Sequence, residues 1–223
     1  MCILMDLYKH ENGSGIFIQI GAGAGDLDKS TLKNGVMKDG FTDFVKGLPR
    51  ERIKKIILVE PNPLNIPLLR ECWKDYPESV IYEIGIVPKA YKGSTIDFFY
   101  CPYDGPHYQV ASIMKSHIYK HYGENCELNK FIIPVMHIED FLKKVTNEEI
   151  ELLSLDIEGI DAEILLDINF NILKLKYLSF EHLHLGGDRA NVLNHLYTSN
   201  YKFLGLGVDH NGYDYLFING SFV

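Results

Sequence analysis

Cysteines are few in this sequence, and they are not paired. The four are Cys2, Cys72, Cys101 and Cys126, with no C-x-x-C motif among them. This spacing argues against a structural zinc site and against a disulfide framework, which both need closely spaced or paired cysteines. Scattered thiols are typical of a reducing compartment, so we expect a cytoplasmic protein.

Long apolar runs are missing as well. No stretch approaches the ~20 apolar residues that a membrane-spanning helix needs. The apolar opening at the N-terminus is only four residues long before Asp6 and Lys9 follow, which does not fit a secretory signal. We therefore expect neither a membrane span nor a signal peptide, and the chain contains no internal repeat or low-complexity tract.

The chain also lacks a cluster of basic residues. Its net charge is −8, and Lys54–Lys55 and Lys143–Lys144 are isolated pairs. Binding along a phosphate backbone needs clustered Lys and Arg, so we expect no nucleic-acid partner. With 223 residues and 46% hydrophobic residues, the chain can bury one sizeable core, and we expect a single domain over residues 1–223.

Strand-like and helix-like patterns alternate along the sequence. Strands are expected at residues 16–20, 53–60, 80–87, 95–100, 131–135, 150–157, 177–182, 201–208 and 213–219. Helices are expected at residues 41–46, 62–73, 138–145, 162–166 and 190–200, with another starting near residues 28–30. This alternation predicts a doubly wound, mostly parallel α/β sheet, closed by an antiparallel hairpin with an Asn211–Gly212 turn. Residues 101–129 form a loop-rich insertion, which is more often functional than idle.

Glycines dominate the end of the first expected strand. Gly21, Gly23 and Gly25 follow residues 16–20, and glycine permits positive φ and close approach of a ligand to the main chain. The second expected strand ends in Glu60. A glycine loop and an acid at the next strand end predict a nucleotide-type pocket, with the carboxylate on the ribose hydroxyls. Glu60 alone also fits a helix cap.

Acids and histidines follow two later strands. Residues two apart on extended chain point the same way, so we expect Asp156 to pair with Glu158, and His182 with His184. If the strands are neighbours, these groups face one space that suits a general base or a divalent cation. Taken singly, each histidine also fits a structural, hydrogen-bonded role.

The glycine spacing separates two classes of nucleotide fold. A dinucleotide fingerprint has a third glycine where this chain has Asp26, and its acid follows after about 20 residues, much sooner than Glu60 does. A nicotinamide-dependent or nucleotide-sugar oxidoreductase is therefore the weaker alternative. A binding module that keeps the fold without turnover is another.

Four segments resemble the FkbM family of methyltransferases. They are residues 17–23 (FIQIGAG), 58–63 (LVEPNP), 153–161 (LSLDIEGID) and 178–182 (LSFEH), and residues 111–112 also match a short element of that family. The resemblance implies a Rossmann-like methyltransferase fold with a seven-stranded sheet. It also implies S-adenosylmethionine as the methyl donor and a hydroxyl acceptor on a sugar, lipid or secondary metabolite. The chain departs from the family at Gly23, where asparagine is common, and Gln19 replaces an acid that many methyltransferases have.

These patterns together assign roles to individual residues. The cofactor-binding set is Gln19, Gly21, Ala22, Gly23, Gly25, Asp26, Glu60, Pro61, Asn62, Gly85, Ile86 and Asp156. The catalytic set is His182, His184, Asp156, Glu158 and Glu181, with one of the two histidines as the general base. We expect no metal, the alternative being a cation on Asp156, Glu158 and His182. Residues 101–129 are expected to cover a small-molecule or glycan acceptor.

Overall fold

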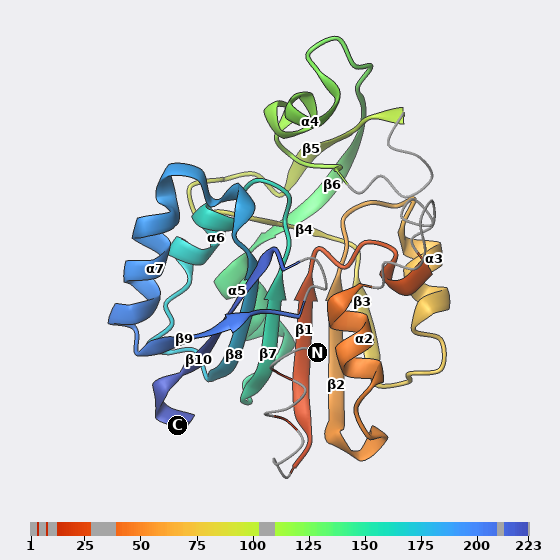
Figure 1. Cartoon of the computed structure of the whole chain (residues 1–223). Coiled ribbons are helices and arrows are strands. Elements are labelled where there is room, and N and C mark those ends of the chain that lie inside the picture. Colours follow the sequence, from red (N-terminus) through yellow and green to blue (C-terminus); the bar gives the residue numbers. More distant parts are fainter. Residues whose placement is uncertain are drawn as a thin grey trace.

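A computed structural model of the chain describes residues 4, 8, 13–27, 39–102, 110–208 and 212–222. Its main feature is a seven-stranded sheet in the order β3-β2-β1-β7-β8-β10-β9, in which β10 alone runs in the direction opposite to the other six strands (Figure 1). The strands are β1 (Gly15–Ile20), β2 (Ile53–Val59), β3 (Ser79–Tyr82), β7 (Ile150–Leu155), β8 (Leu175–Glu181), β9 (Tyr201–Leu206) and β10 (Asp214–Asn219). The expected doubly wound, mostly parallel sheet with a closing hairpin is confirmed.

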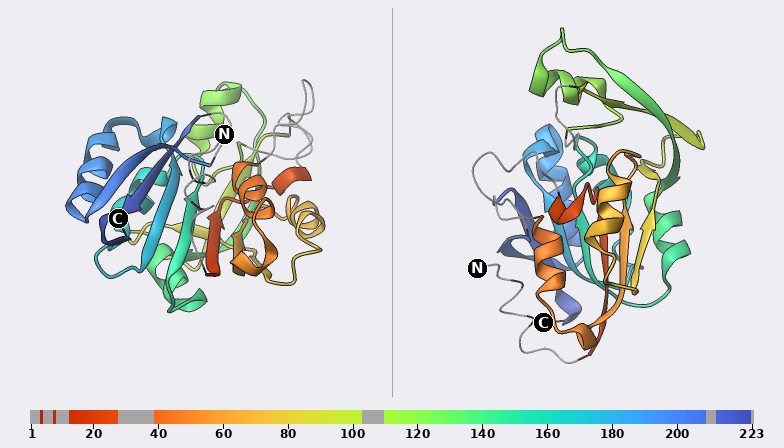
Figure 2. Two further views of the ribbon diagram at one scale, coloured as in Figure 1. Left: turned by 60° about the horizontal axis from the view of Figure 1, so that its bottom comes forward. Right: turned by 90° about the vertical axis from the view of Figure 1, so that its right-hand side faces the viewer.

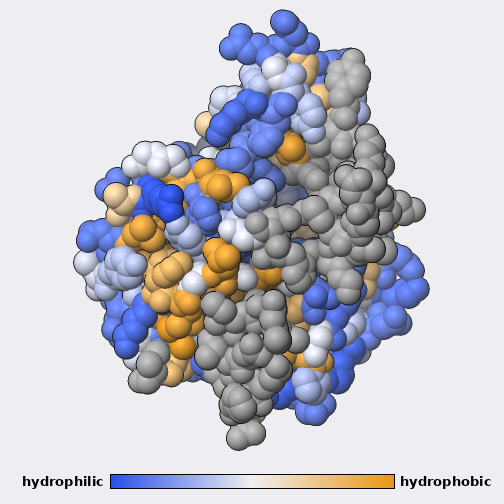
Figure 3. All heavy atoms as spheres, in the orientation of Figure 1, coloured by the Kyte–Doolittle hydropathy of each residue, from blue (hydrophilic) through white to orange (hydrophobic). Residues whose placement is uncertain are grey.

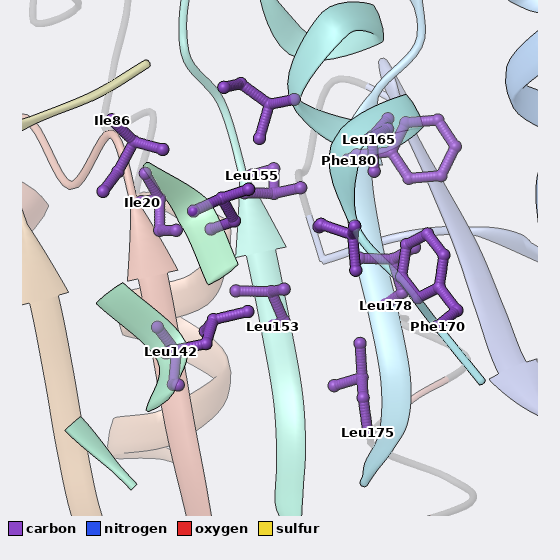
Figure 4. Close-up of a cluster of buried hydrophobic side chains, with 14 of the residues drawn as sticks. Ile20, Ile86, Leu142, Leu153, Leu155, Leu165, Phe170, Leu175, Leu178 and Phe180 are labelled. Atoms are coloured by element: carbon purple, nitrogen blue, oxygen red, sulfur yellow. The ribbon is translucent and has the colours of Figure 1, made fainter. Parts of the chain in front are cut away.

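Each face of this sheet packs against helices because successive strand side chains point in opposite directions. Ile18 and Ile20 of β1 face a core with Leu153 and Phe180, whereas Phe17 joins the core on the other face. Figure 4 shows the first of these cores. It is covered by α5 (Ile138–Val145), α6 (Asp161–Asp167) and α7 (Arg189–Thr198), and the second by α2 (Gly40–Lys46) and α3 (Ile66–Cys72). Burying each of these large apolar side chains stabilises the fold by about 1.5–3 kcal/mol.

A second, three-stranded sheet has the order β4-β6-β5. Its strands are β4 (Gly85–Val87), β5 (Thr95–Tyr100) and β6 (Asn129–His137), and α4 (Lys115–Tyr122) lies between β5 and β6 in the sequence. We call β5, α4 and β6 the arm. Figures 1 and 2 show that the arm projects beyond the carboxyl ends of the parallel strands. Figure 3 shows that its outer end is mostly hydrophilic.

One expectation about this region is wrong. The strand expected at residues 80–87 is divided between the two sheets, because β3 pairs with β2 and β4 pairs with β6. Gly85 permits that change, since a Cβ there would lie 2.9 Å from Ile133 Cδ1 of β6. The insertion expected at residues 101–129 contains α4.

Two further expectations fall outside the described residues: the helix start near residues 28–30, and residues 209–211 of the hairpin turn. The hairpin strands β9 and β10 pair as expected. Across the described ranges, the helices are too short or too polar to cross a bilayer.

Candidate functional site

The glycine loop after β1 is held between two neighbouring strands. The N–H groups of Gly21 and Ala22 both donate to the Val59 carbonyl of β2, each at 3.0 Å. On the other side, a Cβ on Gly21 would lie only 1.7 Å from the Asp156 carbonyl oxygen. Gly21, Gly23 and Gly25 all have positive φ, at 85°, 52° and 59°. Glycine is therefore needed at Gly21 for two reasons, its conformation and the lack of space.

Glu60, just beyond β2, is bonded to the glycine loop. Its Oε2 accepts a hydrogen bond from Gly23 N at 2.7 Å, and its Oε1 accepts one from Asn62 N at 2.8 Å. The Asn65 side chain also donates to Oε1, at 3.3 Å. Burial raises the pKa of Glu60 to about 7, although these three donors oppose the shift. The loop and the carboxylate thus form one hydrogen-bonded unit.

A cavity of about 570 Å³ opens at the carboxyl ends of the parallel strands. This volume lies within the range of small-molecule sites. The expected site residues that line it are Gln19, Gly21, Ala22, Gly23, Gly25, Glu60, Pro61, Gly85, Ile86, Asp156, Glu158, Glu181 and His184. The glycine loop and Glu60 therefore share a cavity, as the sequence predicts.

Three expected site residues are not among the described residues that line the cavity. Asp26 instead pairs with Lys46 at 3.2 Å. Asn62 is fully buried, and its Oδ1 accepts a hydrogen bond from Leu64 N, so it shapes the loop that carries Glu60. His182 stacks on Tyr215 with ring centroids 4.1 Å apart.

The expectation that His182 and His184 point the same way is wrong. β8 ends at Glu181, and His182 already has helical torsion angles, φ −99° and ψ −11°. Leu183–Asp188 continues as a 3-10 helix, so the period-two rule for strands no longer applies. Only His184 of this pair reaches the cavity, and the alternative cation set with His182 is not assembled.

The loop after β7 carries two cavity carboxylates, Asp156 and Glu158, and has an unusual backbone conformation. Glu158 has φ 52°, a left-handed conformation that is rare outside glycine. Asp161 holds this loop by accepting hydrogen bonds from Ile157 N at 2.9 Å and Gly159 N at 3.4 Å. The Ser112 hydroxyl donates to the Glu158 carbonyl at 2.7 Å. Strained residues that are held in this way cluster at functional sites.

Charges crowd the end of the cavity near α4. Desolvation within the site and the neighbouring Glu158 and Glu181 raise the pKa of Asp156 well above its usual range, although its side chain is exposed to the cavity. His184 Nε2 lies 3.5 Å from Glu181 Oε2 and 4.0 Å from Glu158 Oε2. Burial and the nearby His117 nevertheless lower the pKa of His184 to about 4, so its imidazole is neutral at neutral pH.

Several cavity residues were not predicted from the sequence. Asp39 caps α2 by accepting a hydrogen bond from Thr42 N at 2.7 Å, and Gln19 Nε2 donates to its other oxygen at 2.9 Å. His121 reaches the cavity from α4. The sequence contained a signal for each of these two residues. Asp39 is an acid that precedes a short helix, and His121 follows another histidine, His117, by four residues.

Known proteins resemble this chain in sequence and in fold. The Methyltransferase FkbM domain matches residues 19–215. No curated protein sequence matches significantly. The crystal structure of methyltransferase FkbM from Methylobacillus flagellatus KT is similar, with a TM-score of 0.53 and 14% identity. That similarity covers 92% of this chain and 43% of the other, so the present chain spans less than half of that protein's length.

Two other solved structures have lower similarity. Aeropyrum pernix fibrillarin, solved with bound S-adenosyl-L-methionine, has a TM-score of 0.44 and 12% identity, covering 97% of this chain and 72% of that one. Precorrin-6y C5,15-methyltransferase from Geobacter metallireducens GS-15 has a TM-score of 0.45 and 10% identity, covering 96% and 84%.

Proposed function

This chain belongs to the FkbM methyltransferase family, whose methyl donor is S-adenosylmethionine, and we propose that it methylates a hydroxyl oxygen of a small molecule. The acceptor class is a sugar, a lipid or a secondary metabolite. One observation carries the proposal: the glycine loop and Glu60 line the same cavity and are joined by the 2.7 Å hydrogen bond from Gly23 N.

The donor is proposed to lie across the ends of β1 and β2. Its methionine part would contact the main chain of Gly21–Gly25, which leaves room because it lacks large side chains. Its ribose hydroxyls would donate to Glu60. A carboxylate oxygen accepts about two hydrogen bonds, so Oε2 can bind a hydroxyl in addition to Gly23 N. Gly85 and Ile86 would border the adenine.

The methyl group would be transferred near Asp156. This residue follows β7, its N–H donates to the Ile20 carbonyl at 2.9 Å, and it faces the cavity between the glycine loop and Glu158. We assign Asp156, in its ionised form, as the group that accepts the hydroxyl proton, in place of the histidine expected from the sequence. The reason is position: Asp156 borders Gly21 of the glycine loop, whereas His184 lies beside His117 of α4. The acceptor oxygen then bonds to the methyl carbon while the carbon–sulfur bond breaks, which leaves S-adenosylhomocysteine. Glu158, Glu181 and His184 would position the acceptor.

The remaining features support a small acceptor. A net charge of −8 favours a small molecule over nucleic acid. The arm lies beyond the strand ends, so we propose that residues 101–129 cover the acceptor within a single methyltransferase domain. A cytoplasmic location stays a prediction from the sequence.

Calorimetric titration with S-adenosylmethionine and S-adenosylhomocysteine tests the donor site. Glu60→Ala removes hydrogen bonds to a charged group, each worth about 1.5–3 kcal/mol, and should weaken binding about 10- to 100-fold. Asp26→Asn is the matched control, because Asp26 follows the same loop but pairs with Lys46. Equal binding by both variants would contradict the ribose assignment.

A screen of hydroxylated glycans and metabolites with labelled donor tests the reaction. Asp156→Asn should retain donor binding and lose at least about 100-fold in turnover, the usual scale of a proton-transfer group. Donor binding by the wild type without transfer to any hydroxyl acceptor would instead favour a binding module.

A further inference from the structure

Three histidines converge at the end of the cavity that lies under α4. His117 and His121 are four residues apart on α4 and therefore lie on the same face of this helix. His184 approaches from the 3-10 helix after β8. The ring centroid of His117 lies 4.8 Å from each of the other two rings, and His121 and His184 are 5.9 Å apart. One ring nitrogen from each residue lies within 4.8 Å of the others.

Two carboxylates complete the group. Glu158 Oε2 lies 2.7 Å from His117 Nε2, and Glu158, Glu181 and His184 also have ligand atoms within 4.8 Å of one another. The His117 side chain is 5% exposed, and its Nε2 has no hydrogen-bond partner despite the close carboxylate. Two ligand atoms on one metal lie about 3.0–3.4 Å apart when each bond is about 2.1 Å. The 2.7 Å between His117 Nε2 and Glu158 Oε2 is shorter by about 0.3–0.7 Å, so these two atoms must move apart slightly to share one ion.

The surrounding main chain fixes these two residues. Glu158 keeps its left-handed conformation because Asp161 and Ser112 bond to its loop. Gly159 lies against the His117 ring, where a Cβ would come within 3.0 Å of Nδ1. Such outer contacts orient the ligands of metal sites.

We propose that His117, His121, His184 and Glu158 bind one divalent first-row transition metal ion, with Glu181 orienting His184. Several imidazoles favour ions such as Zn²⁺, Ni²⁺ or Co²⁺, whereas Mg²⁺ and Ca²⁺ prefer oxygen ligands. Histidines at i and i+4 of a helix are a known arrangement for zinc binding. The most distant nitrogens, up to 4.8 Å apart, must approach each other by as much as about 1.4–1.8 Å to bind one ion.

The position of the ion suggests a role, which rests on the proposed function. His121, Glu158, Glu181 and His184 line the same cavity as the glycine loop. An ion held there would coordinate the acceptor hydroxyl and favour its loss of a proton to Asp156.

Titration calorimetry of chelator-treated protein without a histidine tag tests the site directly. Wild type should bind one equivalent of Zn²⁺ or Co²⁺ and bind Mg²⁺ at least 100-fold more weakly. His121→Ala and His184→Ala should each weaken Zn²⁺ binding at least 10-fold. His182→Gln is the matched control and should bind as wild type, since His182 stacks on Tyr215.

Circular dichroism will establish that the variants fold, and Glu158→Gln tests the carboxylate without removing volume. Unchanged Zn²⁺ binding in His121→Ala and His184→Ala, or binding no tighter than that of Mg²⁺, would overturn the proposal. Neither measurement contains donor or acceptor. A failure of the metal site is therefore distinguishable from a failure of methyl transfer, because donor titration of metal-free protein reports on the glycine loop and Glu60 alone.

Discussion

Glu60 is a buried carboxylic acid that accepts hydrogen bonds from main-chain N–H groups, so its pKa depends on the folded structure. Its folded pKa of about 7 is above its ordinary value of 4.5 because burial outweighs the hydrogen bonds from Gly23 and Asn62. A raised folded pKa stabilises the protein below the unfolded pKa, and this stability is lost as the pH rises through the folded pKa.

Replacing Glu60 with Gln should therefore remove a pH-dependent part of the free energy of unfolding. In the wild type, the free energy of unfolding should fall by about 3 kcal/mol between pH 4.5 and pH 7 because of Glu60. This value is the pKa shift from 4.5 to about 7, converted at about 1.4 kcal/mol per pKa unit. Urea unfolding at several pH values measures the difference between wild type and Glu60→Gln. A difference in the free energy of unfolding that does not change with pH would contradict the raised pKa of Glu60.

Binding of the methyl donor should depend on Glu60 in the opposite direction: stability falls as the pH rises, but donor affinity should increase. Ribose hydroxyls donate more strongly to a carboxylate than to a neutral acid, so affinity should rise as Glu60 ionises. We expect the Kd for S-adenosylhomocysteine to fall between pH 6 and pH 8 in wild type and to stay level in Glu60→Gln. Calorimetry at both pH values measures this.

Two glycines of one loop should respond differently to alanine. A Cβ on Gly21 would lie 1.7 Å from the Asp156 carbonyl, whereas nothing lies within 4 Å of the same position on Gly23. Gly21→Ala should cost several kcal/mol or prevent folding, and Gly23→Ala about 1–2 kcal/mol from its left-handed conformation. Thermal unfolding ranks the two variants, and equal stability would contradict the close approach of β1 and β7.

At the scale of elements, the first turn of α6 organises the loop that carries Glu158. Asp161 is 1% exposed and accepts two main-chain hydrogen bonds from this loop. Glu163 lies in the same turn and is exposed. Both acids suit the helix dipole, but only Asp161 bonds to the loop.

Asp161→Ala should therefore destabilise the protein by about 1–3 kcal/mol, since it leaves the partly buried N–H groups of Ile157 and Gly159 without this acceptor. Glu163→Ala should change stability by less than about 0.5 kcal/mol. Urea unfolding of the two variants compares them. A similar small effect for both would mean that the loop keeps its conformation without Asp161.

For the whole molecule, the cavity joins elements that are far apart in sequence. Glycines from β1, an acid from β2, the loop after β7 and a helix of the arm all line it. A ligand that binds only the folded chain stabilises it by mass action. S-adenosylhomocysteine at 100 times its Kd should add about 2.7 kcal/mol to the free energy of unfolding in wild type. Nicotinamide dinucleotide at the same concentration is the control and should leave the unfolding temperature unchanged.

Much of the fold was predictable from local patterns. Short apolar runs mark β1, β2, β7 and β8, and such runs are typical of the buried strands of a parallel sheet. The glycines and Glu60 were predictable too, because strand ends in a parallel sheet meet at one edge.

Other features depended on contacts that no local pattern contains. His182 departs from the expected direction because β8 ends one residue before it, and Asp26 turns to Lys46, which is distant in sequence. The strand expected at residues 80–87 is divided because β4 finds a partner in β6.

The sequence by itself indicated the strands, the closing hairpin, the glycine loop and Glu60, because each is marked by residues that are close together in the chain. Only the tertiary structure decided which histidines reach the cavity. His117 and His121 meet His184 and Glu158 through the packing of the arm over the strand ends. Side chains so far apart in sequence come together through long-range packing, which residue spacing alone does not specify.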